Sequence, residues 1–468
     1  MRMKARYILL VVGITLLTCL FFIMSFREEP PHHEDKLPSN IGNRAKVSLS
    51  EEERNEDKGD LPAEGLSDEK QMEHGNELDK VAIDNRQHLK KEGIDKRRSL
   101  PKGKLFELTR AKAKDANQNC SPRENVTFIK AHKTGSSTVQ NIFLRYGDKH
   151  NLQFVLPPAG HHLGYPSYFE KKHMLHNEKD VYNIFCHHTR FSQKIPQVMP
   201  VNTIYITIVR DPVKVFESAF IYFKMDYRLS MTNDPEALQK FLQNAQSIYD
   251  STSNKVHMKN PMLFDMGVAI EDFNSEALVK KHIKTFHKRY RLVMVAEYFE
   301  ESLILLRDLL CWTTEDVVVF KLNTRKDDSI VSLTEKAKQN IRDWNNGDVL
   351  LYEHFNRTIQ KTIDDYGRSR MAAEVATLRE KTQELYEKCI KTDQANKEEG
   401  YFKVWQPFGV HINAFVLKEE QNGNKDCESM IMPEIQFTKD LRRKQFPNLK
   451  EIDVMRRNKV KVPLKRVP

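Results

Sequence analysis

A short polar segment, HKTGSST, covers residues 132–138 and combines one lysine, one glycine and four hydroxyl side chains. It follows the apolar run Val126 to Lys130, which is typical of a β-strand, and precedes apolar residues spaced as on one face of a helix. The N-terminus of a helix binds anions, because free backbone N–H groups and the positive end of the dipole point at the ligand. Gly135 permits close approach of the backbone, and Lys133 adds a mobile cation. The segment therefore predicts a phosphate site.

Two other interpretations of this segment are open. The hydroxyl residues could form only an N-cap cluster at the start of the helix. A Walker A loop would need the pattern G-x-x-x-x-G-K-[ST], whereas here Lys133 precedes the single glycine. The segment is then a phosphate loop of a different kind. We expect its helix to end at Gly147, since glycine is common just after the last helical residue.

A second segment repeats the strand, turn and helix pattern. Thr203 to Val209 is a β-branched run typical of a buried strand, and Pro212 suits the first turn of a following helix. Arg210 would then stand at the carboxyl end of a parallel strand, where open α/β sheets bind ligands. Ser218 lies near the start of the helix, and a guanidinium with a hydroxyl suits a second phosphate. The alternative is a structural surface pair between Arg210 and Asp211.

Together the two segments resemble the 5′- and 3′-phosphosulfate-binding segments of Golgi carbohydrate sulfotransferases. The resemblance is narrower to the galactose 3-O-sulfotransferase family, whose acceptors include galactosylceramide. It extends from about Asn125 to about residue 390, with a weaker similarity at WQPFG and MPEIQ. The segments that carry it are FIKAHKTGSSTVQNI, FCHHTRF, VRDPVKVFESAF, AEYFEESLILLRDLLCW and VFKLNTR.

The resemblance implies an α/β, P-loop-like sulfotransferase fold with a mainly parallel central sheet flanked by helices. It implies 3′-phosphoadenosine 5′-phosphosulfate as the sulfate donor, no required metal, and transfer to the 3-hydroxyl of a terminal β-galactose on a glycolipid or glycan. The expected partners are this acceptor, a membrane and a second copy of the chain, and not a nucleic acid. The residues expected at the 5′-phosphosulfate are Lys133, Thr134, Gly135, Ser136, Ser137 and Thr138, and those at the 3′-phosphate are Arg210 and Ser218.

A sugar hydroxyl is a poor nucleophile, so the reaction calls for a general base, and histidine suits that task. His188, in FCHHTRF, and His132, directly before the loop lysine, are the candidates. We favour His188 slightly, because related uronyl sulfotransferases also have a histidine in the matching segment. The alternatives to the galactose reaction are a uronyl 2-O-sulfotransferase, an inactive nucleotide- or glycan-binding relative and a nucleotide kinase. Arg325 could reach a phosphate or sulfate, or lie in a solvated loop.

The N-terminus predicts the compartment. Residues 7–26 carry no charge, and about twenty helical residues span a bilayer. The basic residues 1–6 precede the span, and the positive-inside rule keeps that end in the cytosol. A cleaved signal peptide is the alternative. We therefore expect a single-pass type II protein of the Golgi membrane, with a largely disordered stem at residues 27–115 and a lumenal domain at residues 120–440.

The net charge of +10 would by itself suggest binding to nucleic acid or to a membrane surface. Residues 441–468 carry ten of the basic residues against two acidic ones, so most of the excess lies in this tail, which we expect to be irregular or peripheral. Five cysteines beyond the span allow two disulfides and one free thiol. Asn125 and Asn356 begin N-x-[ST] sequons, and we prefer Asn356, because Asn125 adjoins a predicted strand.

Overall fold

The structure, a computed structural model, describes residues 120–449 except 233, 235, 323–332, 396–397, 405–411 and 413. The expected membrane span, stem and most of the basic tail lie outside the described residues, as do Arg325 and the WQPFG segment. Within the part that is described, no helix is both long and apolar enough to cross a membrane.

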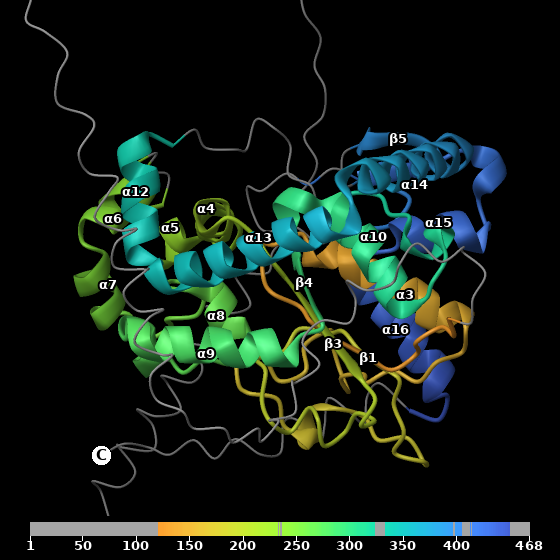
Figure 1. Ribbon diagram of the computed structural model, residues 1–468, viewed down its shortest axis with the longest axis horizontal. Helices are drawn as coiled ribbons and strands as arrows, with labels where there is room; N and C mark the ends of the chain where they lie inside the picture. Colours follow the sequence, from red (N-terminus) through yellow and green to blue (C-terminus); the bar gives the residue numbers. More distant parts are fainter. Residues whose placement is uncertain are drawn as a thin grey trace, which may run out of the picture. The chain divides into compact units, whose positions relative to one another are not determined.

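Four parallel strands form the central sheet in the order β2–β1–β3–β4 (Figure 1). Val126 of β1 lies opposite Ile184 of β2 on one side and Ile204 of β3 on the other. The chain goes from β1 to one neighbour and then returns to the other, so the strand order reverses beside β1. The expected α/β class with a parallel sheet and flanking helices is confirmed. The strands are β1 Val126–Ile129, β2 Ile184–Phe185, β3 Ile204–Val209 and β4 Leu292–Val295.

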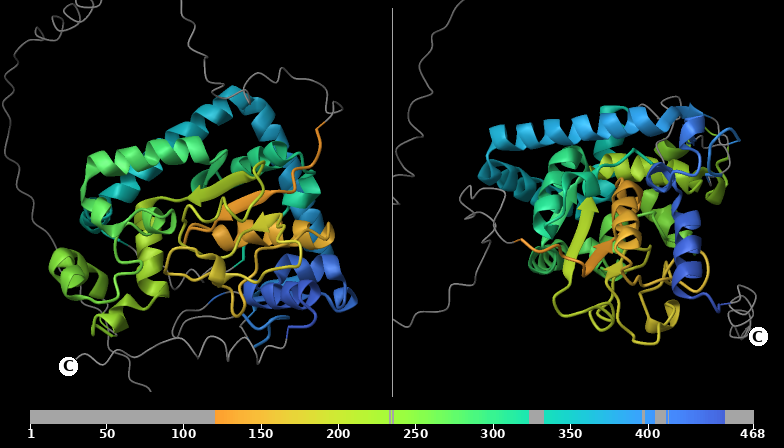
Figure 2. Two further views of the ribbon diagram at one scale, coloured as in Figure 1. Left: turned by 90° about the horizontal axis from the view of Figure 1, so that it is seen from below. Right: turned by 90° about the vertical axis from the view of Figure 1, so that its right-hand side faces the viewer.

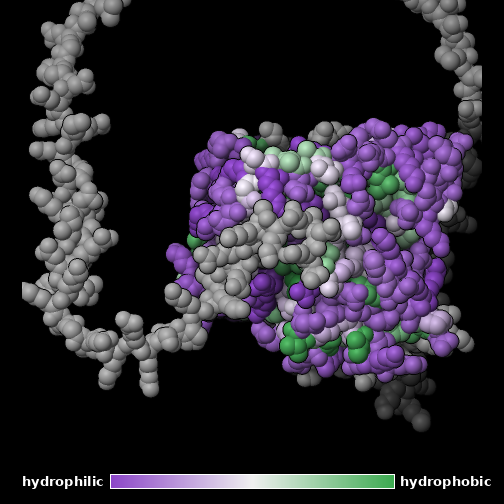
Figure 3. Space-filling model, turned by 45° about the vertical axis from the view of Figure 1, so that its right-hand side comes forward, coloured by the Kyte–Doolittle hydropathy of each residue, from purple (hydrophilic) through white to green (hydrophobic). Residues whose placement is uncertain are grey.

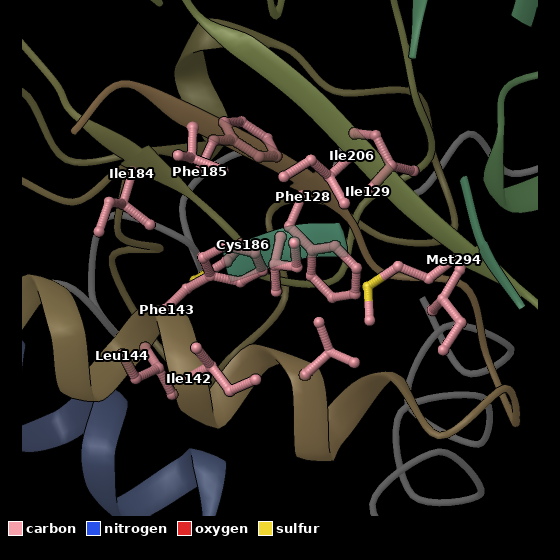
Figure 4. Packing of buried hydrophobic residues seen from close by; sticks show 14 of the residues in the cluster. Phe128, Ile129, Ile142, Phe143, Leu144, Ile184, Phe185, Cys186, Ile206 and Met294 are labelled. Carbon is pink, nitrogen blue, oxygen red and sulfur yellow. The ribbon is translucent and has the colours of Figure 1, made fainter. Parts of the chain in front are cut away.

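Helix α3, Ser136–Lys149, packs its apolar face against the sheet (Figure 4). The rings of Phe128 in β1 and Phe143 in α3 have centroids 5.2 Å apart, and both side chains are fully buried. The sequence predicts that this helix ends at Gly147, but it continues to Lys149. A Cβ at this glycine would lie 2.3 Å from the ring of Phe154, so the glycine serves close packing rather than helix termination.

The remaining helices surround the sheet and build a second apolar cluster. α10 and α13 contact β4, whereas α4, α6, α7 and α12 lie together beside the sheet (Figures 1 and 2). These four helices enclose a cluster that includes Phe216, Phe241 and Trp344. The helices up to the C-terminal region are α4 Pro212–Tyr222, α5 Met225–Arg228, α6 Ala237–Gln243, α7 Ala245–Ser251, α8 Pro261–Asp265, α9 Glu276–Arg289, α10 Phe299–Leu310, α11 Thr314–Val317, α12 Glu335–Trp344, α13 Asn346–Tyr366 and α14 Arg368–Cys389. Short 3₁₀ turns cover Lys171–His173, Ile270–Asn274, Ala296–Tyr298 and Glu419–Gln421.

The C-terminal region adds a hairpin and two helices. Strands β5, Ile390–Ala395, and β6, Ala414–Leu417, pair antiparallel, and α15, Lys425–Ile431, follows. Helix α16, Glu434–Gln445, then packs beside α3 (Figure 1). This helix crosses residue 440, where we had expected the folded domain to end. The first residues of the basic tail are therefore helical and packed rather than irregular.

Two disulfides hold the fold, as the cysteine count allowed. They join Cys120 to Cys311 and Cys389 to Cys427, and Cys186 is a buried free thiol. The first bridge ties the segment before β1 to the end of α10.

Figure 3 shows a largely hydrophilic face with small, separated hydrophobic patches.

Candidate active site

The two predicted phosphate segments meet at the carboxyl ends of neighbouring strands. The loop that carries Lys133 leaves β1, and Arg210 directly follows β3. The Arg210 guanidinium donates a hydrogen bond from Nη1 to the Lys133 carbonyl oxygen over 3.0 Å. Because the strand order reverses beside β1, this position is the switch point of the sheet, where open α/β folds bind ligands.

The loop between β1 and α3 is tightly wound. Lys133 and Gly135 both have left-handed backbone conformations, with φ of 60° and 83°. The hydroxyls of Thr134 and Ser136 both donate to the Ala131 carbonyl oxygen, over 3.0 and 2.5 Å. These two hydroxyls therefore close the loop, and the binding of the donor by Thr134 and Ser136 stays a prediction.

The start of α3 keeps the features of an anion site. Gly135 is exposed, and an added Cβ would meet nothing nearer than Phe299 at 3.8 Å. Ser137 is half-buried, and the Thr138 hydroxyl accepts a hydrogen bond from the Leu322 amide over 3.3 Å. The N–H groups of a first helical turn have no acceptor earlier in their own helix. Backbone donors and the loop lysine are therefore the main anion ligands that this segment offers.

Further polar groups at this end of the sheet come from Lys133 and from helix α4. The Lys133 ammonium lies 3.5 Å from the centre of the Tyr222 ring, a cation–π contact that holds the side chain near α4. The Asp211 carboxylate accepts a hydrogen bond from the Val213 N–H over 2.7 Å and so caps α4. Ser218 is buried in the second turn of the same helix.

Both predicted base candidates lie at this end of the sheet, in contact with each other. His132 follows β1 and His188 follows β2, and their rings stack with centroids 4.0 Å apart and an interplanar angle of 14°. Each residue is 8% exposed. Sequence separation of more than fifty residues hid this contact, which the parallel pairing of β1 with β2 produces.

Asp265 and His257 also belong to the cluster and were missed in the sequence. Asp265, at the end of α8, is fully buried. Its Oδ2 accepts a hydrogen bond from the His132 backbone N–H over 2.7 Å and lies 2.8 Å from His132 Nδ1. The centroid of the His257 ring lies 4.5 Å from that of the His132 ring, and the centroid of the Tyr165 ring lies 4.6 Å from that of the His132 ring. A carboxylate inside the apolar run MLFDMGV was the available signal, since a buried charge needs a partner.

Burial governs the protonation of these groups. It lowers the pKa of His188 well below the ordinary value, and burial together with Lys130 and Lys133 does the same for His132. Burial also raises the pKa of Asp265 to about 7. Neutral imidazoles are therefore favoured in the cluster, and a neutral imidazole can accept a proton.

A partly buried ion pair joins α16 to the end of β1. The Lys130 ammonium contacts the Glu434 carboxylate, which also accepts a hydrogen bond from the Gln140 amide over 2.9 Å. Burial opposes ionisation of Glu434, but Lys130, His161 and His187 together outweigh it and lower the pKa of the carboxyl to about 2. Arg442, on the same helix, donates from Nε to the Pro157 carbonyl over 3.0 Å and from Nη2 to the Gly160 carbonyl over 2.6 Å.

The sequence model of a family described as Galactose-3-O-sulfotransferase matches residues 100–445. The chain belongs to this family. It is 37% identical to human galactosylceramide sulfotransferase over 336 residues, which cover 69% of this chain and 79% of that protein. It is 35% identical to human galactose-3-O-sulfotransferase 2 over 339 residues, 70% of this chain and 85% of that one. Bovine galactose-3-O-sulfotransferase 4 is 30% identical over 413 residues, 71% of this chain and 85% of that protein.

Membership makes the chain a sulfotransferase that acts on galactose, and the family implies 3′-phosphoadenosine 5′-phosphosulfate as the donor. The exposed helix start with Lys133, and Arg210 beside it, fit the two anionic ends of that donor. In the described ranges, no three or more His, Cys, Asp or Glu side chains are grouped so as to hold a metal ion.

The other predicted positions of this galactose-3-O-sulfotransferase lie away from the site. Asn125 bonds through its side chain to Asn202 and Asn183, over 2.8 and 2.9 Å. Asn356 is half-buried in the middle of α13. Both sequons remain predictions. Of the aromatic residues near the motifs, Tyr165 and Tyr222 line the site, whereas other rings, such as that of Phe169, belong to the core.

Proposed function

We propose that this enzyme transfers the sulfuryl group of 3′-phosphoadenosine 5′-phosphosulfate to the 3-hydroxyl of a terminal β-galactose. The acceptor is a glycolipid of the galactosylceramide type or a glycoprotein glycan. The observation that carries the proposal is the meeting of Lys133, Arg210 and the stacked His132–His188 pair at one end of the sheet. A cation pair for the donor and a base for the acceptor are what sulfuryl transfer requires.

The donor would bind across the loop after β1 and the start of α4. The amides of the first α3 turn, with Ser137 and Lys133, would hold the 5′-phosphosulfate. Arg210, with Ser218 on the helix behind it, would hold the 3′-phosphate. Thr134 and Ser136 support this site by fixing the loop through the Ala131 carbonyl.

The protein groups have separate tasks in the reaction. The bound donor supplies an electrophilic sulfur with a phosphate leaving group. One imidazole of the stacked pair takes the proton of the galactose hydroxyl, while the hydroxyl oxygen forms the new bond to sulfur. Lys133 stabilises the negative charge that collects on the phosphate oxygen as the sulfur–oxygen bond breaks. The low exposure of both histidines keeps bulk water from competing with the sugar.

We further propose that the enzyme works in the Golgi lumen, tethered by residues 7–26 as a single-pass type II protein. The uncharged stretch behind a basic end supports this orientation. The two disulfides support an oxidising compartment.

The test is a labelled-sulfate assay on matched acceptors. Galactosylceramide, lactosylceramide, N-acetyllactosamine and a core mucin-type glycan would be compared with a uronic-acid polysaccharide as the control. We expect label on the galactosides with the sulfate at position 3, and none on the control. Label on the uronic acid alone would indicate a 2-O-sulfotransferase, and donor binding without any transfer would indicate an inactive relative.

A further inference from the structure

We propose that Asp265 is a positioning residue that makes His132, rather than His188, the base of the reaction. Asp265 would hold the His132 ring with Nδ1 as the donor, which leaves Nε2 for the proton of the sugar hydroxyl. This inference rests on the sulfuryl transfer proposed above, and it departs from the slight preference for His188 drawn from the sequence.

The two hydrogen bonds to one oxygen determine the tautomer of His132. The backbone N–H of His132 donates to Asp265 Oδ2 over 2.7 Å, so this oxygen serves as an acceptor. His132 Nδ1 lies 2.8 Å from the same oxygen, and when the carboxyl is ionised this nitrogen is the one that carries a hydrogen. In the neutral ring, Nε2 is then the nitrogen with a free lone pair. An oriented imidazole of this kind is the working arrangement of histidine bases in other enzymes.

His188 has no such partner. Its Nδ1 is buried without a hydrogen-bond partner among the described residues, so no acceptor there selects its tautomer. Its ring lies against the flat face of His132, with 4.0 Å between centroids. His188 is thus suited to keep the His132 ring in its plane, while Asp265 fixes the direction of its nitrogens.

The position of Asp265 is itself held by the fold. It is the last residue of α8, and its carbonyl accepts a hydrogen bond from the Phe191 amide over 3.0 Å. At the other end of α8, the buried Asp348 carboxylate accepts from the Met262 and Leu263 amides over 3.0 and 2.9 Å. The α8 segment is therefore fixed at both ends, which gives the carboxylate the rigidity that a positioning role needs.

The surroundings of the pair make the carboxylate important for charge. When His132 takes a proton it becomes a buried cation near other cations, and the Asp265 carboxylate is the group in direct contact that offsets this charge. Burial raises the pKa of Asp265 to about 7, so the carboxyl is ionised above that pH. The titratable and charged groups that face the pair are Lys130, Lys133, Glu434, His161, His162, His188, His257, Tyr165, Arg190 and Asp348. Removal of the anion should lower the pKa of His132, so the acidic limb of the kcat–pH profile should move to lower pH.

The test is Asp265→Asn, measured with saturating donor and acceptor across pH. The His132 backbone N–H keeps the oxygen of the introduced amide facing the ring, so the geometry is retained while the charge is lost. We expect kcat to fall about 10–10²-fold, with donor Kd changed by less than about twofold. The acidic limb should move to lower pH. Asp272→Asn is the matched control, because Asp272 pairs with His282 over 2.8 Å away from the site. This control should change neither kcat nor the limb.

Double variants separate positioning from a general structural effect. In the His132→Ala background, Asp265→Asn should cost nothing further, whereas in the His188→Ala background it should cost its full factor. Unchanged kcat in Asp265→Asn, an unmoved limb, or equal losses in both backgrounds would overturn the proposal. Failure of the wild-type enzyme to sulfate any galactoside would instead overturn the proposed function. The two results are therefore distinguishable.

Discussion

In the proposed mechanism, Lys133 is the residue on which the reaction depends most directly. Its backbone is left-handed, and its ammonium contacts the Tyr222 ring of α4. The residue therefore lies between the start of α3 and helix α4. The negative charge of the leaving phosphate develops during the reaction, so a cation aimed at it stabilises the transition state more than the bound donor.

Lys133→Ala should therefore lower kcat by about 10²–10³-fold while donor Kd changes much less. Steady-state kinetics and donor titration would measure the two quantities separately. Lys149→Ala, at the exposed end of the same helix, is the control and should behave as wild type. A loss confined to donor affinity would show that Lys133 binds the ground state alone.

Arg210 has a different expected signature, because the 3′-phosphate does not react. Arg210→Ala should weaken donor binding by about 10–10²-fold, the loss of a charge-assisted contact, and leave kcat at saturating donor nearly unchanged. Lys214→Ala, on the exposed side of α4, removes a nearby cation as the control. The assignment of the second phosphate would be abandoned if Arg210→Ala bound the donor as tightly as wild type.

Most of the candidate donor-binding and base residues could be predicted from the sequence, but their arrangement in space could not. Lys133, Arg210, His132 and His188 stand out because short motifs at strand ends carry them. The direct contact between the two histidines depends on strand pairing, which local patterns do not reveal. Asp265 was missed for a related reason: it comes from a five-residue helix whose place beside β1 depends on the tertiary fold.

At the scale of elements, α16 connects the end of the chain to the site. In the first turn of α16, Glu434 pairs with Lys130. The Thr438 hydroxyl lies 2.9 Å from His187 Nε2. Arg442 donates hydrogen bonds to the loop that precedes His161. Local periodicity could predict β1, β3 and the start of α3. It could not predict that a basic, C-terminal segment would become a packed helix, because its buried arginine is satisfied by carbonyls far away in the sequence.

Arg442→Ala tests the role of this helix. The change leaves the Pro157 and Gly160 carbonyls without their donor, and we expect a loss of about 1–3 kcal/mol in the free energy of unfolding, together with reduced activity. Arg443→Ala, the exposed neighbour, should cost less than about 0.5 kcal/mol. Chemical denaturation and the sulfate assay would be run on both variants. Equal stabilities for the two would contradict the packing role of α16.

At the scale of the whole molecule, the account predicts a topology. If residues 7–26 are the anchor, the sulfotransferase domain lies inside sealed Golgi-derived vesicles, and added protease should leave it intact until detergent opens them. A tag placed before residue 7 should be removed in the absence of detergent, which serves as the control for protease activity. Digestion of the domain in intact vesicles would reverse the proposed orientation.

The chemistry assigned to the whole molecule has one position-specific consequence. If the galactose 3-hydroxyl is the nucleophile, an acceptor that lacks this oxygen cannot react, although the rest of the sugar can still bind. The decisive measurement compares transfer of labelled sulfate to a β-galactoside with transfer to its 3-deoxy analogue, using wild-type enzyme and saturating donor. We predict transfer to the first acceptor, none to the second, and competitive inhibition of the first by the second. Sulfation of the 3-deoxy galactoside at a comparable rate would contradict the account.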